Sequence, residues 1–68
     1  MKKETNTHFR IIEMLHYLLS NWATIDELQS KFSLSKRMVM YYLSAYRKTG
    51  FTVETKTEIN YFYHVKHP

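Results

Sequence analysis

The sequence predicts an α+β domain in which three helices are followed by a two-stranded β-hairpin. Up to about residue 50, apolar residues recur at steps of three and four, which is the spacing of amphipathic helices. After Gly50 apolar and polar residues alternate, as in strands. A chain of 68 residues with one Gly and one Pro has room for one domain and few flexible linkers. We place this domain at residues 7–66.

The first predicted helix follows a short polar lead. Residues 1–6 show no apolar periodicity and include two lysines, so we expect a flexible basic N-terminus. Thr7 can cap the helix that follows, and Asn21 suits its end. Apolar residues at helical spacing predict a wide buried stripe in this segment. The residues of this stripe are Ile11, Ile12, Leu15, Leu18, Leu19 and Trp22.

A second, short helix is predicted from its start signal. Thr24 can accept a hydrogen bond from the backbone of Glu27, whose side chain can reach back to Thr24, as in a capping box. Ile25, Leu28 and Phe32 then fall on one face, which gives about two helical turns. So short a helix depends on packing against its neighbours.

A tight turn joins the second helix to the third. Only Ser33 and Leu34 separate Phe32 from Ser35, which can cap the next helix. This spacing is typical of a helix-turn-helix unit. We expect Leu34 to fill the space between the two helices. Serine should be tolerable at position 33 if that residue keeps an ordinary backbone conformation.

The third predicted helix begins at its cap Ser35 and ends before Gly50, which can adopt a left-handed conformation. Val39, Leu43 and Tyr46 recur at spacings of four and three and should face the core. The opposite side carries Arg37, Met38, Tyr41, Ser44 and Lys48. Residues 28–53 contain five Lys or Arg and no Asp or Glu, so the outer face is purely basic. Such a helix is a candidate for a nucleic-acid groove.

The last third of the chain predicts a hairpin that covers the helices. Residues 55–58 are polar, so we expect the connection between the strands there. One side of the alternating pattern should face the core. Its residues are Phe51, Val53, Ile59, Tyr61, Tyr63 and Val65.

Three segments together resemble the winged helix-turn-helix domains of bacterial transcription regulators. They are TIDELQSKFSLSKRMV, the Leu43, Tyr46 and Gly-Phe pattern through Phe51, and the late strand YFYHV. The resemblance spans roughly residues 8–65 and is to biotin-repressor-like, deoxyribonucleoside-repressor-like, Mga-like and antiterminator-like members. Many members have Gly where this chain has Ser33 and Asn60. The resemblance implies a three-helix winged helix-turn-helix fold with the C-terminal hairpin as the wing.

The resemblance also implies which residues meet DNA. Ser35, Lys36, Arg37, Met38 and Tyr41 would approach the major groove, and a hairpin tip around Lys56 would touch the backbone or the minor groove. With Ser44 and Lys48 added from the basic helix face, the predicted DNA-binding residues are Ser35, Lys36, Arg37, Met38, Tyr41, Ser44, Lys48 and Lys56.

We therefore expect a sequence-specific protein that binds double-stranded DNA and regulates transcription. The formal net charge of +4 and the isoelectric point near 9.5 favour an anionic partner. Two alternatives remain open, because a fold does not determine a function. The domain could dock an acidic protein through its basic face, or act as an architectural DNA-binding factor of a mobile element, like an excisionase.

Other classes of function find little support in the sequence. Cysteine is absent and the four histidines have few acidic neighbours, so we predict no metal site and no cofactor. No nucleophile with a base can be proposed, so we predict no enzyme. We expect a cytoplasmic protein, because no segment has the roughly 20 apolar residues that cross a bilayer. Tyr17, Tyr42 and Phe62 are the aromatic residues through which we expect a homodimer to form.

Overall fold

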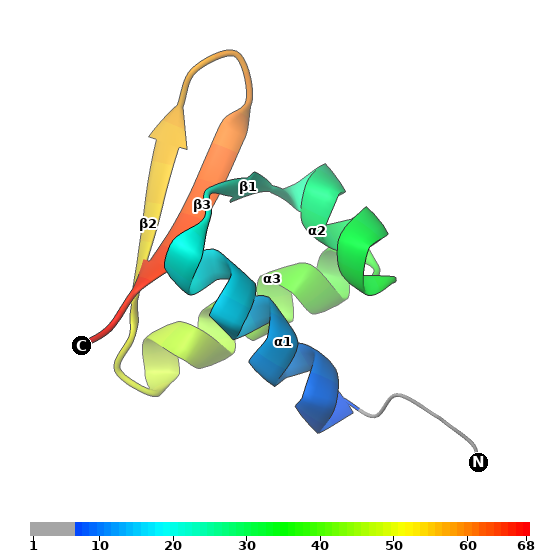
Figure 1. Ribbon diagram of the computed structural model, residues 1–68, viewed down its shortest axis with the longest axis vertical. Helices are drawn as coiled ribbons and strands as arrows, with labels where there is room; N and C mark the ends of the chain where they lie inside the picture. The colour runs from blue at the N-terminus through cyan, green and yellow to red at the C-terminus, as the bar shows by residue number, and fades with distance from the viewer. Residues whose placement is uncertain (1–6) are drawn as a thin grey trace.

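The computed structural model describes residues 7–68 and confirms an α+β architecture, with three helices and a three-stranded antiparallel sheet (Figure 1). The sequence-based prediction for residues 1–6 lies outside this range. None of the helices described is both long enough and apolar enough to cross a membrane. The elements in chain order are α1 (Thr7–Ser20), β1 (Ala23–Thr24), α2 (Ile25–Phe32), α3 (Lys36–Lys48), β2 (Thr52–Thr57) and β3 (Tyr61–Lys66).

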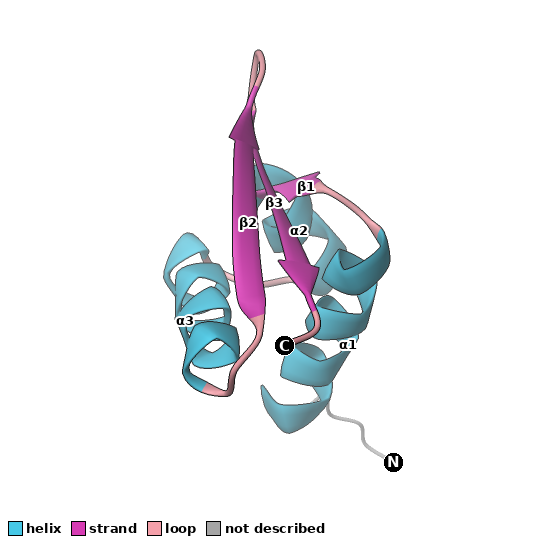
Figure 2. Cartoon of the chain, turned by 90° about the vertical axis from the view of Figure 1, so that its left-hand side faces the viewer, coloured by secondary structure: helices cyan, strands magenta, loops and turns pink. Residues whose placement is uncertain are grey.

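The sheet differs from the predicted two-stranded hairpin by one additional strand. Its order is β1-β3-β2, because Ala23 and Thr24 pair with Tyr63 and Phe62. A strand of two residues is too short to show an alternating pattern, so residue spacing provides no signal for it. In Figure 2 the β2–β3 pair is seen in front of the helices, with α3 on the side of β2 and α1 on the side of β3.

The connection between β2 and β3 lies later in the chain than predicted. Thr57 pairs with Tyr61, so the connection is residues 58–60 and not the predicted residues 55–58. The end of the β2–β3 pair extends beyond the helices (Figure 1), where both faces of a strand meet solvent. Polar residues are therefore tolerated there within the strand, and polarity does not mark the turn.

The core lies where α1, α2 and α3 meet the inner face of the sheet. The predicted inward residues Val39, Leu43 and Tyr46 of α3 are buried there, which confirms the helical periodicity. The prediction that Leu34 fills the helix-turn-helix corner is also confirmed, because this side chain is buried in the same cluster. The buried residues are Met14, Leu18, Ala23, Leu28, Leu34, Val39, Tyr42, Leu43, Tyr46, Tyr63 and Val65.

Several apolar residues assigned to the core lie outside it. Ile12 of α1 is 54% exposed, because it lies at the edge of the stripe whose centre is formed by Met14 and Leu18. Ile59 is 97% exposed, because it belongs to the connection between the strands and not to a strand face. Tyr61 was likewise predicted to face the core and is exposed, and Phe9 of α1 is exposed as well.

Of the two hydrogen bonds that the capping box predicts at the start of α2, one is present. The Thr24 hydroxyl accepts the Glu27 backbone N–H at 3.1 Å. The Glu27 carboxylate accepts a hydrogen bond from the Tyr17 hydroxyl of α1, where the capping box predicts a bond back to Thr24. This hydrogen bond raises the pKa of the Tyr17 hydroxyl above its ordinary value. The side chain of Glu27 therefore links α2 to α1, while its backbone N–H takes part in the cap of α2.

The turn between α2 and α3 requires a left-handed residue. Ser33 has φ 56° and ψ 50°, so it does not keep the ordinary conformation in which serine is readily tolerated at this turn. In this geometry the N–H groups of Ser33 and Leu34 both donate to the Gln29 carbonyl and complete the end of α2. The sharp turn thus places a side chain in a backbone region that favours glycine.

We predict that Ser33→Gly stabilises the protein. Glycine relieves the left-handed strain, and after its larger entropy loss on folding the net gain should be about 0.5–1 kcal/mol. The control is Ser30→Gly at an exposed interior position of α2, which should destabilise by about 0.5–1 kcal/mol. Urea denaturation of the three proteins measures both changes, and equal destabilisation by the two substitutions would contradict the account of the turn.

Tyr46 links α3 to α1 through the core. Its buried hydroxyl donates a hydrogen bond of 2.6 Å to the Ile11 carbonyl. Burial, together with the nearby Tyr42, raises the pKa of the Tyr46 hydroxyl well above its ordinary value. The folded state therefore holds this proton more tightly than the unfolded chain does.

From this we predict a loss of stability at high pH that depends on Tyr46. The stability that the folded state gains by holding the Tyr46 proton is complete below the unfolded pKa of about 10. It is lost progressively as the pH rises above that value. Tyr46→Phe should cost about 1 kcal/mol at neutral pH and make the alkaline decline shallower. Tyr41→Phe, on the exposed side of α3, is the control and should leave the neutral-pH stability unchanged. Denaturant titrations at pH 7 to 11 compare the three proteins.

Candidate nucleic-acid interface

Local hydrogen bonds set both ends of α3. At its start the Ser35 hydroxyl accepts the Met38 N–H at 3.1 Å, as the sequence predicts. At its end the Thr49 hydroxyl donates to the carbonyls of Ala45 and Tyr46, and Gly50 follows with φ 102°. These contacts fix how many turns of α3 are presented to solvent.

One stripe of α3 points directly away from the core. Arg37, Tyr41, Ser44 and Lys48 follow one another at spacings of four, three and four, so they line up along the helix. Arg37 and Lys48 are exposed, Tyr41 is 60% exposed and Ser44 is half-buried. The opposite side of the helix is the one that contributes buried residues to the core. We call these four residues the α3 stripe.

The charge around the α3 stripe is positive and uncompensated. Lys36 and Arg47 flank the stripe, and both are exposed. The ion pairs among residues 9–68 are Lys56 with Glu58 and Lys66 with Glu54, both in the β2–β3 segment. No carboxylate between residues 28 and 53 can offset the cations of α3.

Two of these cations lie where they oppose the helix dipole. Lys36 and Arg37 occupy the first turn of α3, which has no acidic residue. Positive charge at a helix N-terminus costs about 0.3–1 kcal/mol per residue, and an anion bound there offsets this cost. The start of α3 is thus electrostatically suited to a phosphate group.

Two residues of α3 differ from the predicted interface. Met38, predicted on the outer side, is half-buried and packs against the core. Met40, which was not predicted, is 41% exposed and flanks the α3 stripe. Its spacing of three residues from Arg37 and four from Ser44 was the signal that could have identified it. Arg47 is one of the five basic residues of the segment 28–53, and it belongs with the interface as well, because it is exposed beside Lys48.

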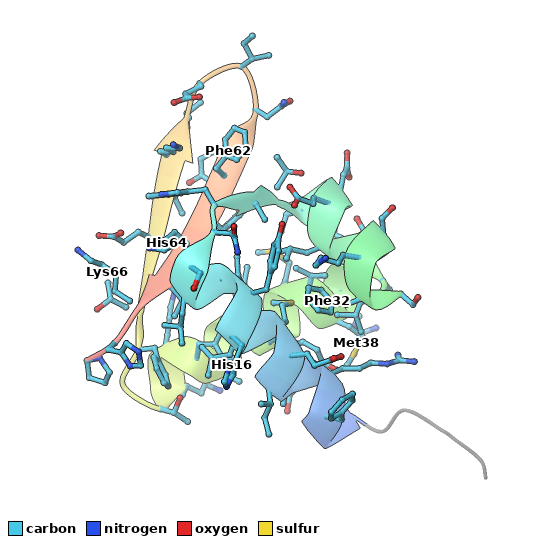
Figure 3. All side chains as sticks on the ribbon, viewed as in Figure 1. His16, Phe32, Met38, Phe62, His64 and Lys66 are labelled. Carbon is cyan, nitrogen blue, oxygen red and sulfur yellow. The ribbon has the colours of Figure 1, made fainter. Side chains whose placement is uncertain are left out.

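Lys56 does not lie at the hairpin tip, which corrects the prediction. It pairs with Phe62 within the sheet, and its ammonium lies 4.6 Å from the Trp22 ring centre and 5.6 Å from that of Phe62. The same ammonium is 3.7 Å from the Glu58 carboxylate. Trp22 also stacks on His64 at 4.8 Å, so these rings form a cluster on the outer face of the sheet. Figure 3 labels Phe62 and His64 of this cluster.

The aromatic residues predicted to form a dimer do not form one surface. Tyr42 is buried in the core, which excludes it from such a contact. Phe62 lies in the outer sheet cluster with Lys56. Tyr17 contacts Phe32 edge-on at 5.9 Å, on the α1–α2 side of the molecule. The predicted set therefore divides among three places.

The structure thus brings Lys36, Arg37, Tyr41, Ser44 and Lys48 together on the exposed part of α3, with Ser35 at its N-cap. It places Met38 against the core and Lys56 on the sheet. Within the described part of the chain, no three His, Cys, Asp or Glu residues gather where they could hold a metal ion. The chain matches no protein-family model, and no curated protein or solved structure shows significant similarity to it. Function is therefore inferred from the residues and their geometry.

Proposed function

We propose that this chain is a winged helix-turn-helix protein that binds double-stranded DNA in a sequence-specific manner and regulates transcription. The observation that carries the proposal is the α3 stripe. An exposed helix face with arginine, tyrosine, serine and lysine in line, and with no acid in the surrounding sequence, fits the major groove in width and in charge. In this proposal α2 and the turn at Ser33, which directly precede α3, are the first helix and the turn of a helix-turn-helix unit.

Each residue of the α3 stripe has a chemical role in this proposal. Arg37, near the helix start, can donate paired hydrogen bonds to the O6 and N7 atoms of guanine. Lys48, about three turns further along, neutralises a phosphate. The hydroxyls of Tyr41 and Ser44 can donate to phosphate or base edges, and the Tyr41 ring offers apolar contact to a thymine methyl.

The β2–β3 pair serves as the wing in this proposal. Its connection at residues 58–60 extends beyond the helices (Figure 1) and includes Glu58, so the tip brings little positive charge to DNA. Lys56 reaches a phosphate only by leaving the Glu58 carboxylate and the Trp22 ring. The wing therefore contributes less to affinity than α3 does.

Salt dependence tests the electrostatic part of the proposal. If Lys36, Arg47 and Lys48 neutralise about three phosphates, the logarithm of the binding constant should fall with the logarithm of the salt concentration with a slope of roughly −3. Fluorescence anisotropy with a labelled duplex between about 50 and 200 mM salt measures this slope. Binding that is indifferent to salt would contradict the proposed phosphate contacts.

A second candidate is a protein-interaction module whose basic face docks an acidic partner. The exposed Met40 and Tyr41 favour it, because methionine and tyrosine are enriched where proteins meet. Selection from a random duplex pool followed by gel shift distinguishes the candidates. An enriched motif supports sequence-specific binding, and its half-site spacing reports the geometry of the complex. Binding without sequence preference favours a protein partner or an architectural role on DNA.

A further inference from the structure

An apolar groove lies between α1 and α2. Its walls include Phe9 and Ile12 of α1, which are 55% and 54% exposed, and the half-buried Tyr17 and Phe32. The groove has a volume of about 420 Å³. Figure 3 labels His16 and Phe32, which lie along it. Two large exposed apolar side chains beside a groove of this kind mark an interaction surface.

The groove carries one charge of each sign. Glu13 of α1 and Lys31 near the end of α2 both line it. Neither residue forms an ion pair within the described part of the chain, although the Lys31 ammonium lies 4.8 Å from the Tyr17 ring centre. A surface with separate positive and negative groups complements itself when a two-fold axis turns one copy onto another.

We propose that this groove binds a second copy of the chain. The α1 helix of each copy lies in the α1–α2 groove of the other, so Phe9 and Ile12 of one copy contact Tyr17 and Phe32 of its partner. Glu13 of each copy then faces Lys31 of the other, and the contact forms twice. The four helices make a small bundle in which the exposed apolar side chains of α1 are covered.

This arrangement leaves the α3 stripe uncovered. The groove is formed by residues of α1 and α2, whereas the α3 stripe lies on the side of α3 opposite its buried residues, so a contact through the groove does not use the outer side of α3. Two copies would present two α3 helices to one duplex. Dimer formation is a proposal separate from DNA binding, and an experiment can refute either one without refuting the other.

Sedimentation velocity over a range of protein concentrations tests the dimer first. We expect reversible dimer formation by the full chain without DNA, and a dissociation constant raised by about 100-fold or more in Ile12→Glu, since that change places an unpaired charge in the apolar contact. Ile59→Glu is the matched control, because it adds the same charge at an exposed isoleucine outside the groove, and it should leave the dimer unchanged. A full chain that remains monomeric up to about 1 mM overturns the proposal.

A charge exchange tests the pairing of Glu13 with Lys31. Glu13→Lys and Lys31→Glu should each weaken the dimer by about tenfold, because each places like charges opposite one another. The double variant Glu13→Lys/Lys31→Glu should restore the dimer to within a few-fold. Circular dichroism establishes that each variant is folded. A double variant as weak as the two single changes combined overturns the assigned pairing. A monomer that still binds DNA refutes only the dimer, whereas a dimer that binds no DNA refutes only the proposed function.

Discussion

Replacing Leu43 with alanine is expected to leave a large fraction of the chain unfolded at room temperature. Leu43 is fully buried on the inner side of α3, within the cluster that joins all three helices to the sheet. Truncating a buried leucine to alanine costs about 2–5 kcal/mol, because apolar contacts are lost and a cavity remains. A domain of 68 residues is stabilised by only about 3–10 kcal/mol in total, so this one change consumes much of that stability.

Met40→Ala provides the control for Leu43→Ala. Met40 lies in the same helix but is 41% exposed, so its truncation should change stability by less than about 1 kcal/mol. Urea denaturation followed by circular dichroism measures both variants. If the two substitutions have equal effects, α3 does not pack in the orientation described, and the assignment of its outer side fails with it.

Arg37→Ala is expected to weaken binding to a selected DNA site by about 1–3 kcal/mol and to relax the sequence preference at one base pair. The guanidinium is exposed in the first turn of α3 and forms no ion pair among the described residues, so it can approach a guanine edge. Stability should not fall, because the substitution removes a positive charge from a helix N-terminus and introduces a strong helix former. The loss of affinity would therefore report on binding and not on folding.

Lys48→Ala is the matched control within the α3 stripe. As a phosphate contact, Lys48 should matter equally for every sequence, and its removal should reduce the salt slope by about one. Anisotropy titrations on the selected site and on a scrambled duplex separate the two behaviours. Equal effects of both substitutions on both duplexes would mean that base recognition lies elsewhere in the molecule.

The parts of the fold that depend on local contacts were predictable from the sequence. The starts of α2 and α3 follow from Thr24 and Ser35, whose hydroxyls accept N–H groups only three residues further on. The inner side of α3 follows from helical spacing. The hairpin connection was misplaced because the register of β2 against β3 is set by pairing across the sheet, such as Val53 with Val65, and not by the polarity of the turn.

In the candidate interface, too, the parts that depend on local residue spacing were predictable and the parts that depend on distant contacts were not. The α3 stripe was predictable, because an exposed helix face follows directly from residue spacing. Lys56 was misplaced because its position depends on the register of β2 and on contacts with Trp22 and Phe62, both distant in the sequence. Met38 was misjudged and Met40 was not predicted, because both lie at the flanks of the helix, where packing against the rest of the fold decides which side chain is covered.

The most direct test of the central claim is an NMR titration of the ¹⁵N-labelled chain with a duplex chosen by selection. The account predicts that the largest amide shift changes fall at residues 35–48 of the α3 region, with smaller ones in the β2–β3 connection. Changes concentrated on the outer face of the sheet, around Trp22 and His64, with α3 unaffected, would contradict it.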